Sequence, residues 1–253
     1  MSPELKAAVL RMYDKQKEAK QKQAEQGKHD QGNRSGVTAG SHFAEVAELI
    51  REDLIRRCSF APNAVCLRAE CLKLPGWFRP TKDWDIIAYH GDSLVAAIEL
   101  KSISSSFGNN ANNRTEEALG AASDIRIAHQ KGLLGDARVP PILGYVLIVA
   151  ETEESTTVRA KKPAQTKYPI DPAFEGIPYI ERFRLLCERL QSESIYQAVW
   201  YVTASEDRRG ARTVSEVVLR VVPRRLGRLL EPTQGLMPLA PNLRARLQTV
   251  TLV

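Results

Sequence analysis

The sequence has few cysteines, and they are not spaced to bind zinc. Its four cysteines are Cys58, Cys66, Cys71 and Cys187. They form no Cys-x-x-Cys pair, and no histidines accompany them at zinc-finger spacing. This small number also argues against a disulfide scaffold. We therefore expect free thiols, buried or half-buried, in a reducing compartment.

Long hydrophobic runs are absent too. No apolar stretch approaches the length of a membrane span. The first residues, MSPELKAAVLRMYDKQKEAK, lack the basic flank, apolar block and small-residue cleavage site of a secretory signal. These absences argue against a membrane or secreted protein, and we expect a cytoplasmic location.

Acidic residues are outnumbered by basic ones. The chain has 253 residues, with 36 Lys and Arg against 30 Asp and Glu, and a formal net charge of +6. Lys and Arg neutralise phosphates and release counterions, so this balance suits a polyanionic partner such as DNA.

The hydrophobic pattern predicts an α/β fold. Apolar residues at helical spacing predict a helix that Ser2 caps, with Pro3 as its first residue, and a second helix that Ser41 caps. The rest of the pattern gives the order strand, strand, helix, strand, helix, strand. This order is typical of a mixed β-sheet core flanked by helices, here with an added N-terminal helical segment.

Changes in composition divide the chain into three parts. Residues 1–35 read as an N-terminal helix with a polar connector, 36–205 as the core, and 206–253 as a basic C-terminal extension packed on it. Within the core, residues 152–178 are rich in Pro, Lys and Thr and are expected to form a long loop.

Three charges interrupt the two strand-like runs of WDIIAYHGDSLVAAIELKSISSSF, which spans residues 84–107. Side chains alternate along a strand, so Glu99 and Lys101 share one face. A two-residue turn at Gly91 and Asp92 would send the Asp85 carboxylate to the other face. An odd loop or a β-bulge would instead set Asp85 opposite Glu99. The hypothesis of a shared site therefore requires one of these.

Two carboxylates and an amine on one strand face suit metal-dependent hydrolysis of phosphodiesters. Mg²⁺ takes oxygen ligands and is commonly held by one or two carboxylates plus a substrate phosphate. A nearby lysine can orient or deprotonate the attacking water. The alternative from the same residues is a surface salt bridge on a half-exposed hairpin, in an α/β protein without this activity.

The pattern of one acid followed by Glu-x-Lys resembles the PD-(D/E)XK nucleases. The surrounding stretches LPGWFRPTKDWDIIAYHGDSLVAAIELKS, SFGNNANNRTEEALGAASD and DQGNRSGVTAG are similar to XhoI-type restriction endonucleases. In this chain Trp84 stands where the superfamily motif has proline. The resemblance is dense over residues 30–48 and 74–124.

The resemblance implies a Mg²⁺-dependent, homodimeric type II restriction endonuclease that cuts both strands of double-stranded DNA at the palindrome CTCGAG. It implies a cognate DNA methyltransferase as functional partner, without stable contact. It assigns Asp85 and Glu99 as metal ligands and Lys101 as the catalytic lysine. Glu48 matches an accessory acidic position on the first core helix, although its spacing alone indicates a solvated glutamate.

Side chains near the motif are candidates for DNA contact, because Asn amides bond adenine edges and Arg and Lys bond guanine edges or phosphates. The candidates are Asn109, Asn110, Asn112, Asn113, Arg114 and Lys82. FGNNANNR equally suits a loop that caps the next helix at Asn113. Two rival functions stay open: another PD-(D/E)XK nuclease that repairs DNA or resolves junctions, and a non-catalytic DNA-binding protein of the same fold.

Overall fold

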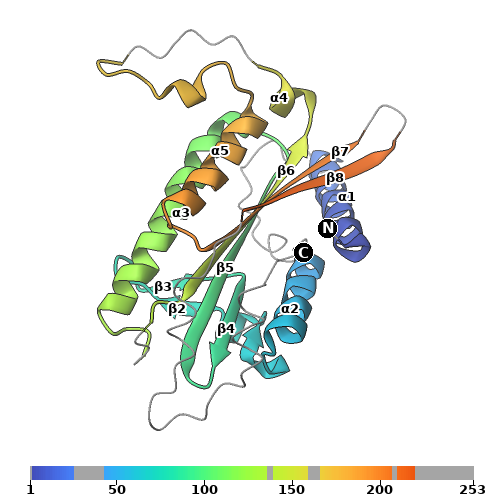
Figure 1. Ribbon diagram of the computed structural model, residues 1–253. Coiled ribbons are helices and arrows are strands. Elements are labelled where there is room, and N and C mark those ends of the chain that lie inside the picture. Colours follow the sequence, from blue (N-terminus) through green and yellow to red (C-terminus); the bar gives the residue numbers. More distant parts are fainter. Residues whose placement is uncertain (1, 26–42, 136–138, 159–165, 207–209, 220–253) are drawn as a thin grey trace.

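A mixed six-stranded sheet forms the centre of the molecule. The computed structural model describes residues 2–25, 43–135, 139–158, 166–206 and 210–219 (Figure 1). The sheet has the order β1-β4-β5-β6-β7-β8. Its strands are β1 (Val65–Cys66), β4 (Ile86–His90), β5 (Ser93–Ile103), β6 (Ile142–Glu151), β7 (Ala198–Glu206) and β8 (Arg212–Leu219). β5, β6 and β7 are parallel, and the other neighbouring pairs are antiparallel.

Helices cover both faces of this sheet. α3 (Phe107–Gln130) and α5 (Tyr179–Ser192) lie on one face, and α1 (Pro3–Glu25) and α2 (Ala44–Cys58) lie on the other (Figure 1). The alternation along β5 produces the two cores: Ala97 and Ile103 pack toward α3 and α5, and Ile98 and Leu100 pack toward α1 and α2. The predicted fold, a mixed sheet flanked by helices with an N-terminal helical segment, is confirmed.

The N-terminal helix packs on the sheet. Leu5, Val9 and Met12 are buried, and the Ser2 hydroxyl accepts the Leu5 N–H at 3.3 Å, as the sequence predicted. α2 begins at Ala44, while Ser41, its predicted cap, lies outside the described residues.

The sheet extends past the predicted end of the core at residue 205. β8 pairs with β7 from Arg212 to Leu219, and the Arg212 guanidinium bonds the Asp14 carboxylate of α1. The first described residues of the predicted extension are therefore part of the fold. Residues 220–253 lie outside the described part.

Two segments predicted as loops contain helices. α3 begins at Phe107, so the Asn-rich segment forms its first turns, and the predicted start at Asn113 is wrong. Phe107 and Ala111, four residues apart, are both buried on one helical face, and this packing outweighs the low helix propensity of asparagine. Within residues 152–178, α4 (Glu153–Thr156) and the short 3-10 helix η3 (Pro172–Phe174) interrupt the predicted loop.

A small second sheet precedes the motif strands. It pairs β2 (Lys73–Pro75) with β3 (Thr81–Asp83), and residues 76–80 form the tip between them. The sequence did not predict these two short strands. This hairpin matters because β3 carries Lys82 toward the main sheet.

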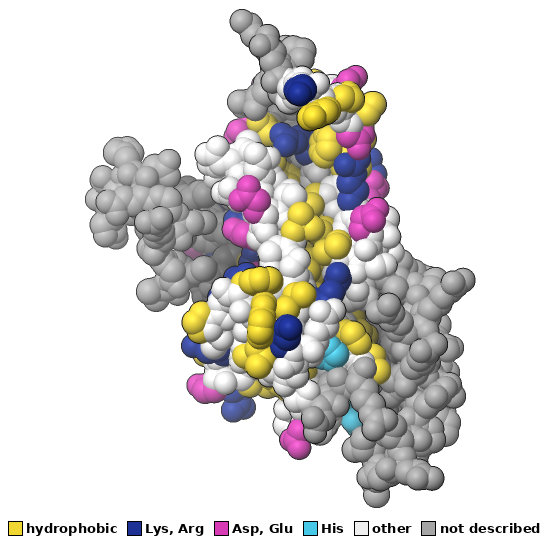
Figure 2. Space-filling view, turned by 90° about the vertical axis from the view of Figure 1, so that its left-hand side faces the viewer, with side chains coloured by type: hydrophobic (Ala, Val, Ile, Leu, Met, Phe, Trp, Pro, Cys, Tyr) yellow, Lys and Arg dark blue, Asp and Glu magenta, His cyan; other side chains and the backbone are white. Residues whose placement is uncertain are grey.

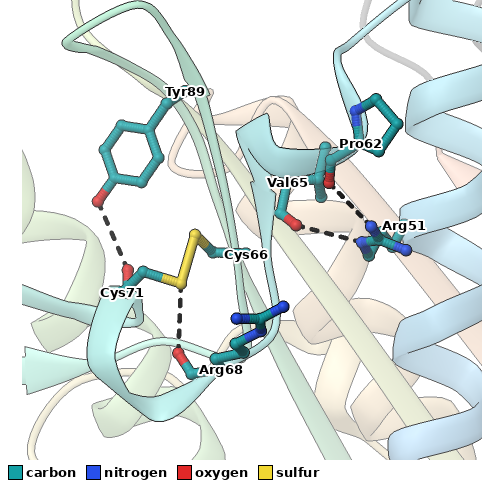
Figure 3. Close-up of a disulfide and its surroundings, with 7 residues drawn as sticks. All are labelled: Arg51, Pro62, Val65, Cys66, Arg68, Cys71 and Tyr89. Atoms are coloured by element: carbon teal, nitrogen blue, oxygen red, sulfur yellow. Dashed lines mark hydrogen bonds between the residues drawn. A yellow bond between two sulfur atoms is a disulfide. The ribbon is translucent and has the colours of Figure 1, made fainter.

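Cys66 and Cys71 form a disulfide, contrary to the prediction of free thiols (Figure 3). The chain turns back through the 3-10 helix η2 (Ala69–Cys71), which brings the two Cα atoms to 6.0 Å, a spacing usual for disulfides. Cys58 and Cys187 are free and buried, as predicted. Within the described ranges, no helix has both the length and the apolar character needed to cross a membrane.

Candidate active site

A β-bulge brings Asp85 opposite Glu99. β4 and β5 are joined by the two-residue turn at Gly91 and Asp92, with His90 paired to Ser93. The register then shifts, so that Ala88 faces Ala96 and Ile86 faces Ile98. Continuing this register by one residue places Asp85 against Glu99. The hypothesis required an odd loop or a β-bulge, and the structure has a bulge at Val95 in β5. The turn itself has two residues.

Asp85 directly precedes β4 and is fixed by hydrogen bonds to the backbone of β5. Its N–H donates to the Ile98 carbonyl at 3.2 Å, and its Oδ2 accepts the Leu100 N–H at 2.7 Å. The carboxylate thus lies alongside the strand that carries Glu99 and Lys101.

Glu99 is buried and is held by two lysines. It is 6% exposed, and Lys82 Nζ donates to its Oε2 at 2.6 Å, while Lys101 Nζ donates to its Oε1. The lysine side chains are only 15% and 23% exposed. β5 is an internal strand of the sheet. This group is therefore a buried charge cluster and not a surface salt bridge on an exposed hairpin.

Trp84 supports the lysine from β3. The indole is buried, and Lys82 Nζ lies 4.7 Å from its ring centroid. A cation over an aromatic face gains electrostatic stabilisation, so the indole helps to hold Lys82 toward Glu99. Proline at this position would offer no such face.

The pKa values of Asp85 and Glu99 are shifted in opposite directions. Burial and the neighbouring Glu99 charge raise the pKa of Asp85 above its ordinary value, against the opposing effect of Lys101. Burial also acts on Glu99, but the charges of Lys101 and Lys82 outweigh it and lower the pKa of Glu99. Asp85 is therefore the carboxylate whose ionised form most needs another cation.

Asp85 and Glu99 offer the kind of ligand that a hard divalent cation takes. Mg²⁺ binds carboxylate oxygens together with water and phosphate oxygens. Asp85 Oδ2 bonds a backbone N–H, and a carboxylate retains further lone pairs for a cation. Among the described residues there is no cluster of three or more His, Cys, Asp or Glu side chains suited to a metal, so the fit rests on Asp85 and Glu99.

Glu48 is not part of this group. Its carboxylate accepts a bond from Arg51 Nη1 at 2.6 Å, and its side chain is 47% exposed. Arg51 in turn bonds the carbonyls of Val65 and Pro62, beside the disulfide (Figure 3). α2 packs into the core on the opposite face of the sheet from Ala97. These contacts give an accessory metal role for Glu48 no support.

Five of the six candidate DNA-contacting residues lie on α3, where they form two sets. Asn109, Asn112 and Asn113 are exposed on one face of its first turns. Asn110 and Arg114 are half-buried and bond each other at 3.2 Å. Asn110 also donates to the carbonyls of Ser105 and Ser106 at 3.1 Å, so it is engaged in holding the helix start.

Two residues at the site carried no sequence signal of their role. Lys82 was a DNA candidate, but its bond to Glu99 depends on a strand too short to show periodicity. Tyr145 pairs with Glu99 across the β5–β6 ladder, and its buried hydroxyl has no partner in the described part of the chain. A fully apolar run marks a buried strand but not which residue lies beside a charge.

A comparison with known families identifies the family of this chain. The profile of the family described as restriction endonuclease XhoI matches residues 22–215, a range that includes Asp85, Glu99 and Lys101. The chain belongs to the XhoI restriction endonuclease family. This finding confirms the resemblance stated from the sequence.

Three curated relatives are named type II restriction enzymes. The type II restriction enzyme XhoI of Xanthomonas vasicola is 41% identical over 161 residues, which is 63% of this chain and 63% of that enzyme. BstVI of Geobacillus stearothermophilus is 36% identical over 171 residues, 65% of this chain and 74% of that enzyme. AbrI of Azospirillum brasilense is 42% identical over 109 residues, 43% of this chain and 49% of that enzyme. No solved structure matches the chain.

Proposed function

We propose that the chain is a type II restriction endonuclease of the PD-(D/E)XK superfamily that cuts both strands of DNA at CTCGAG. The observation that carries the proposal is the position of Asp85 opposite Glu99, whose carboxylate bonds Lys101 on the internal strand β5. Burying charged side chains costs free energy, and the stability of a fold does not require it. Such a cluster therefore points to a functional site. Membership of the XhoI family supports the reaction class, and CTCGAG is the target that the resemblance implies.

Asp85 and Glu99 are the residues that would hold Mg²⁺. When bound, the ion polarises the phosphate and lowers the pKa of a coordinated water. The Leu100 N–H orients the Asp85 carboxylate, and the bulge keeps it level with Glu99. Both ligands therefore come from paired, rigid strands, which fixes their separation.

Lys101 lies two residues after Glu99 on β5, so both side chains are on the same face of the strand. Its ammonium is placed to orient or deprotonate the attacking water and to offset charge that develops on the phosphate. Lys82 remains on the second Glu99 oxygen and can neutralise this carboxylate when Lys101 turns to the substrate. The second lysine thus allows the first to act.

DNA contact is assigned to the exposed start of α3, while Lys82 stays bonded to Glu99. Asn109, Asn112 and Asn113 are free to reach base edges, because their side chains lie on the solvent face of the helix. Arg114 is engaged by Glu117 and Asn110 and supports this surface.

The assembly follows from the target. A palindrome is read by a two-fold symmetric homodimer in which each subunit cuts one strand. The functional partner is a methyltransferase that protects the same sequence without stable contact. The place of action is the cytoplasm, where both enzymes meet the host DNA.

Digestion of a mixed-sequence plasmid tests this function. With Mg²⁺ the purified chain should give a defined fragment ladder, and EDTA should abolish it. A smear or nicking at junctions would instead indicate a repair or junction-resolving nuclease. Binding without any cutting would indicate a DNA-binding protein without the activity.

A further inference from the structure

Two aromatic side chains project from the tip between β2 and β3. Trp77 is 47% exposed and Phe78 is 72% exposed, and they are adjacent in the sequence. On the face of the molecule that carries α3, hydrophobic side chains gather in the lower half, with Lys or Arg side chains among them (Figure 2). Neighbouring exposed aromatics are a costly surface unless they meet a partner.

The tip is held rigidly by one buried carboxylate. Asp124 of α3 is 2% exposed, and its Oδ1 accepts the N–H groups of Trp77 and Phe78 at 2.7 and 2.8 Å. Its Oδ2 accepts from Arg79 Nε at 2.8 Å. A side chain at Gly76 would come within 2.6 Å of the same carboxylate. The backbone is thus fixed so that both rings are presented outward.

Positive charge lies beside the tip. Lys131 Nζ lies 5.0 Å from the Trp77 ring centroid, and the Arg79 side chain is 45% exposed. Aromatic side chains beside cations suit a DNA duplex, since the cations meet phosphates and a ring can wedge between base steps or contact a thymine methyl group in the major groove.

The tip is also close to the proposed site. Phe78 is four residues from Lys82, which bonds Glu99. Four residues span at most about 14 Å, which corresponds to about four base steps at 3.4 Å along one strand. A duplex with its scissile phosphate at the site therefore passes within reach of the tip.

We propose that Trp77 and Phe78 contact bases of the DNA duplex beside the scissile phosphate. The inference rests on the proposed function, because it takes the duplex to lie at Asp85 and Glu99. It adds a contact that depends on apolar surface and not on charge. Removing either ring should therefore weaken binding without reducing the number of counterions released.

Fluorescence anisotropy with a labelled duplex that contains CTCGAG and four flanking base pairs on each side tests this, with Ca²⁺ to prevent cutting. Phe78→Ala and Trp77→Ala should each weaken binding at least ~5-fold, because each variant loses the apolar surface that the ring buries against the DNA. The slope of log Kd against log salt should stay at the wild-type value. Phe174→Ala, which removes an aromatic that is 40% exposed on η3, should bind like the wild type.

Thermal melts and sedimentation without DNA complete the experiment. Equal binding by Phe78→Ala and the wild type would overturn the inference while leaving the nuclease proposal intact. A weaker oligomer of Phe78→Ala would overturn it too, because the tip would then meet a second copy of the chain. If the wild-type protein neither binds nor cuts the duplex, the proposed function fails and the inference fails with it.

Discussion

Replacing Lys101 separates the chemistry of the site from its charge. Lys101→Arg keeps a cation beside Glu99, but a guanidinium is bulkier, planar and effectively never deprotonated. Lys101→Ala removes the cation, while Lys82 still bonds Glu99 at 2.6 Å. Both variants should therefore fold, dimerise and bind the target with Ca²⁺ present.

The main effect should fall on the chemical step. Losing a positioned acid–base group commonly costs ~10²–10⁴-fold in rate. We expect cleavage at least ~100-fold slower in both variants, equivalent to about 2.7 kcal/mol of barrier. The free energy of unfolding of Lys101→Ala should fall by about 1.5–3 kcal/mol, the cost of losing one hydrogen bond between charged groups. Glu99 keeps its second lysine, so the larger penalty of an unpaired buried charge does not arise.

Single-turnover cleavage of a cognate duplex, alongside a thermal melt, measures both effects. Lys73→Ala is the matched control, because Lys73 is 56% exposed and pairs with Asp83 on the neighbouring hairpin. It should cut at close to the wild-type rate. If Lys101→Arg also does so, Lys101 is only a salt-bridge partner and the catalytic assignment is refuted.

Four further outcomes follow from the structure. Asp85→Ala and Glu99→Ala should each abolish cleavage and calorimetric Mn²⁺ binding while leaving duplex binding largely intact; cutting by either variant would contradict the site. Because the pKa of Asp85 is raised and that of Glu99 lowered, Asp85 is protonated first as pH falls, so Mn²⁺ affinity should decline on acidification before Glu99 titrates. Burial raises the pKa of Cys58 to about 11, so alkylation at pH 8 should be slow until the protein is unfolded in urea. Asp124→Ala should lower the free energy of unfolding by at least about 2 kcal/mol, measured by urea titration, because three bonds to a buried carboxylate are lost.

Strand alternation was sufficient to predict the central pair of the site. Glu99 and Lys101 share a face whatever the surroundings, and the requirement for an odd residue followed from the position of Asp85. The sequence did not show whether a bulge or a longer turn supplies this extra residue, because a bulge at Val95 and a longer turn leave similar sequence patterns. The bulge is decided by how β5 packs between β4 and β6.

Contacts between distant segments were the part that the sequence concealed. Lys82 reaches Glu99 from a three-residue strand, which is too short for a period to show. The start of α3 was misplaced because asparagine favours turns, whereas burial of Phe107 decides for helix. Cys66 and Cys71 carry no pairing signal at their spacing, and only the turn after β1 brings them together.

Cleavage of two plasmids that differ at one base pair tests the central claim most directly. One plasmid carries a single CTCGAG and the other carries the same site with one base pair changed. With Mg²⁺, the wild-type chain should convert only the first plasmid to one linear product, and Glu99→Ala should convert neither. Equal cutting of both plasmids, or linear product from Glu99→Ala, would contradict a site-specific nuclease whose chemistry depends on Glu99.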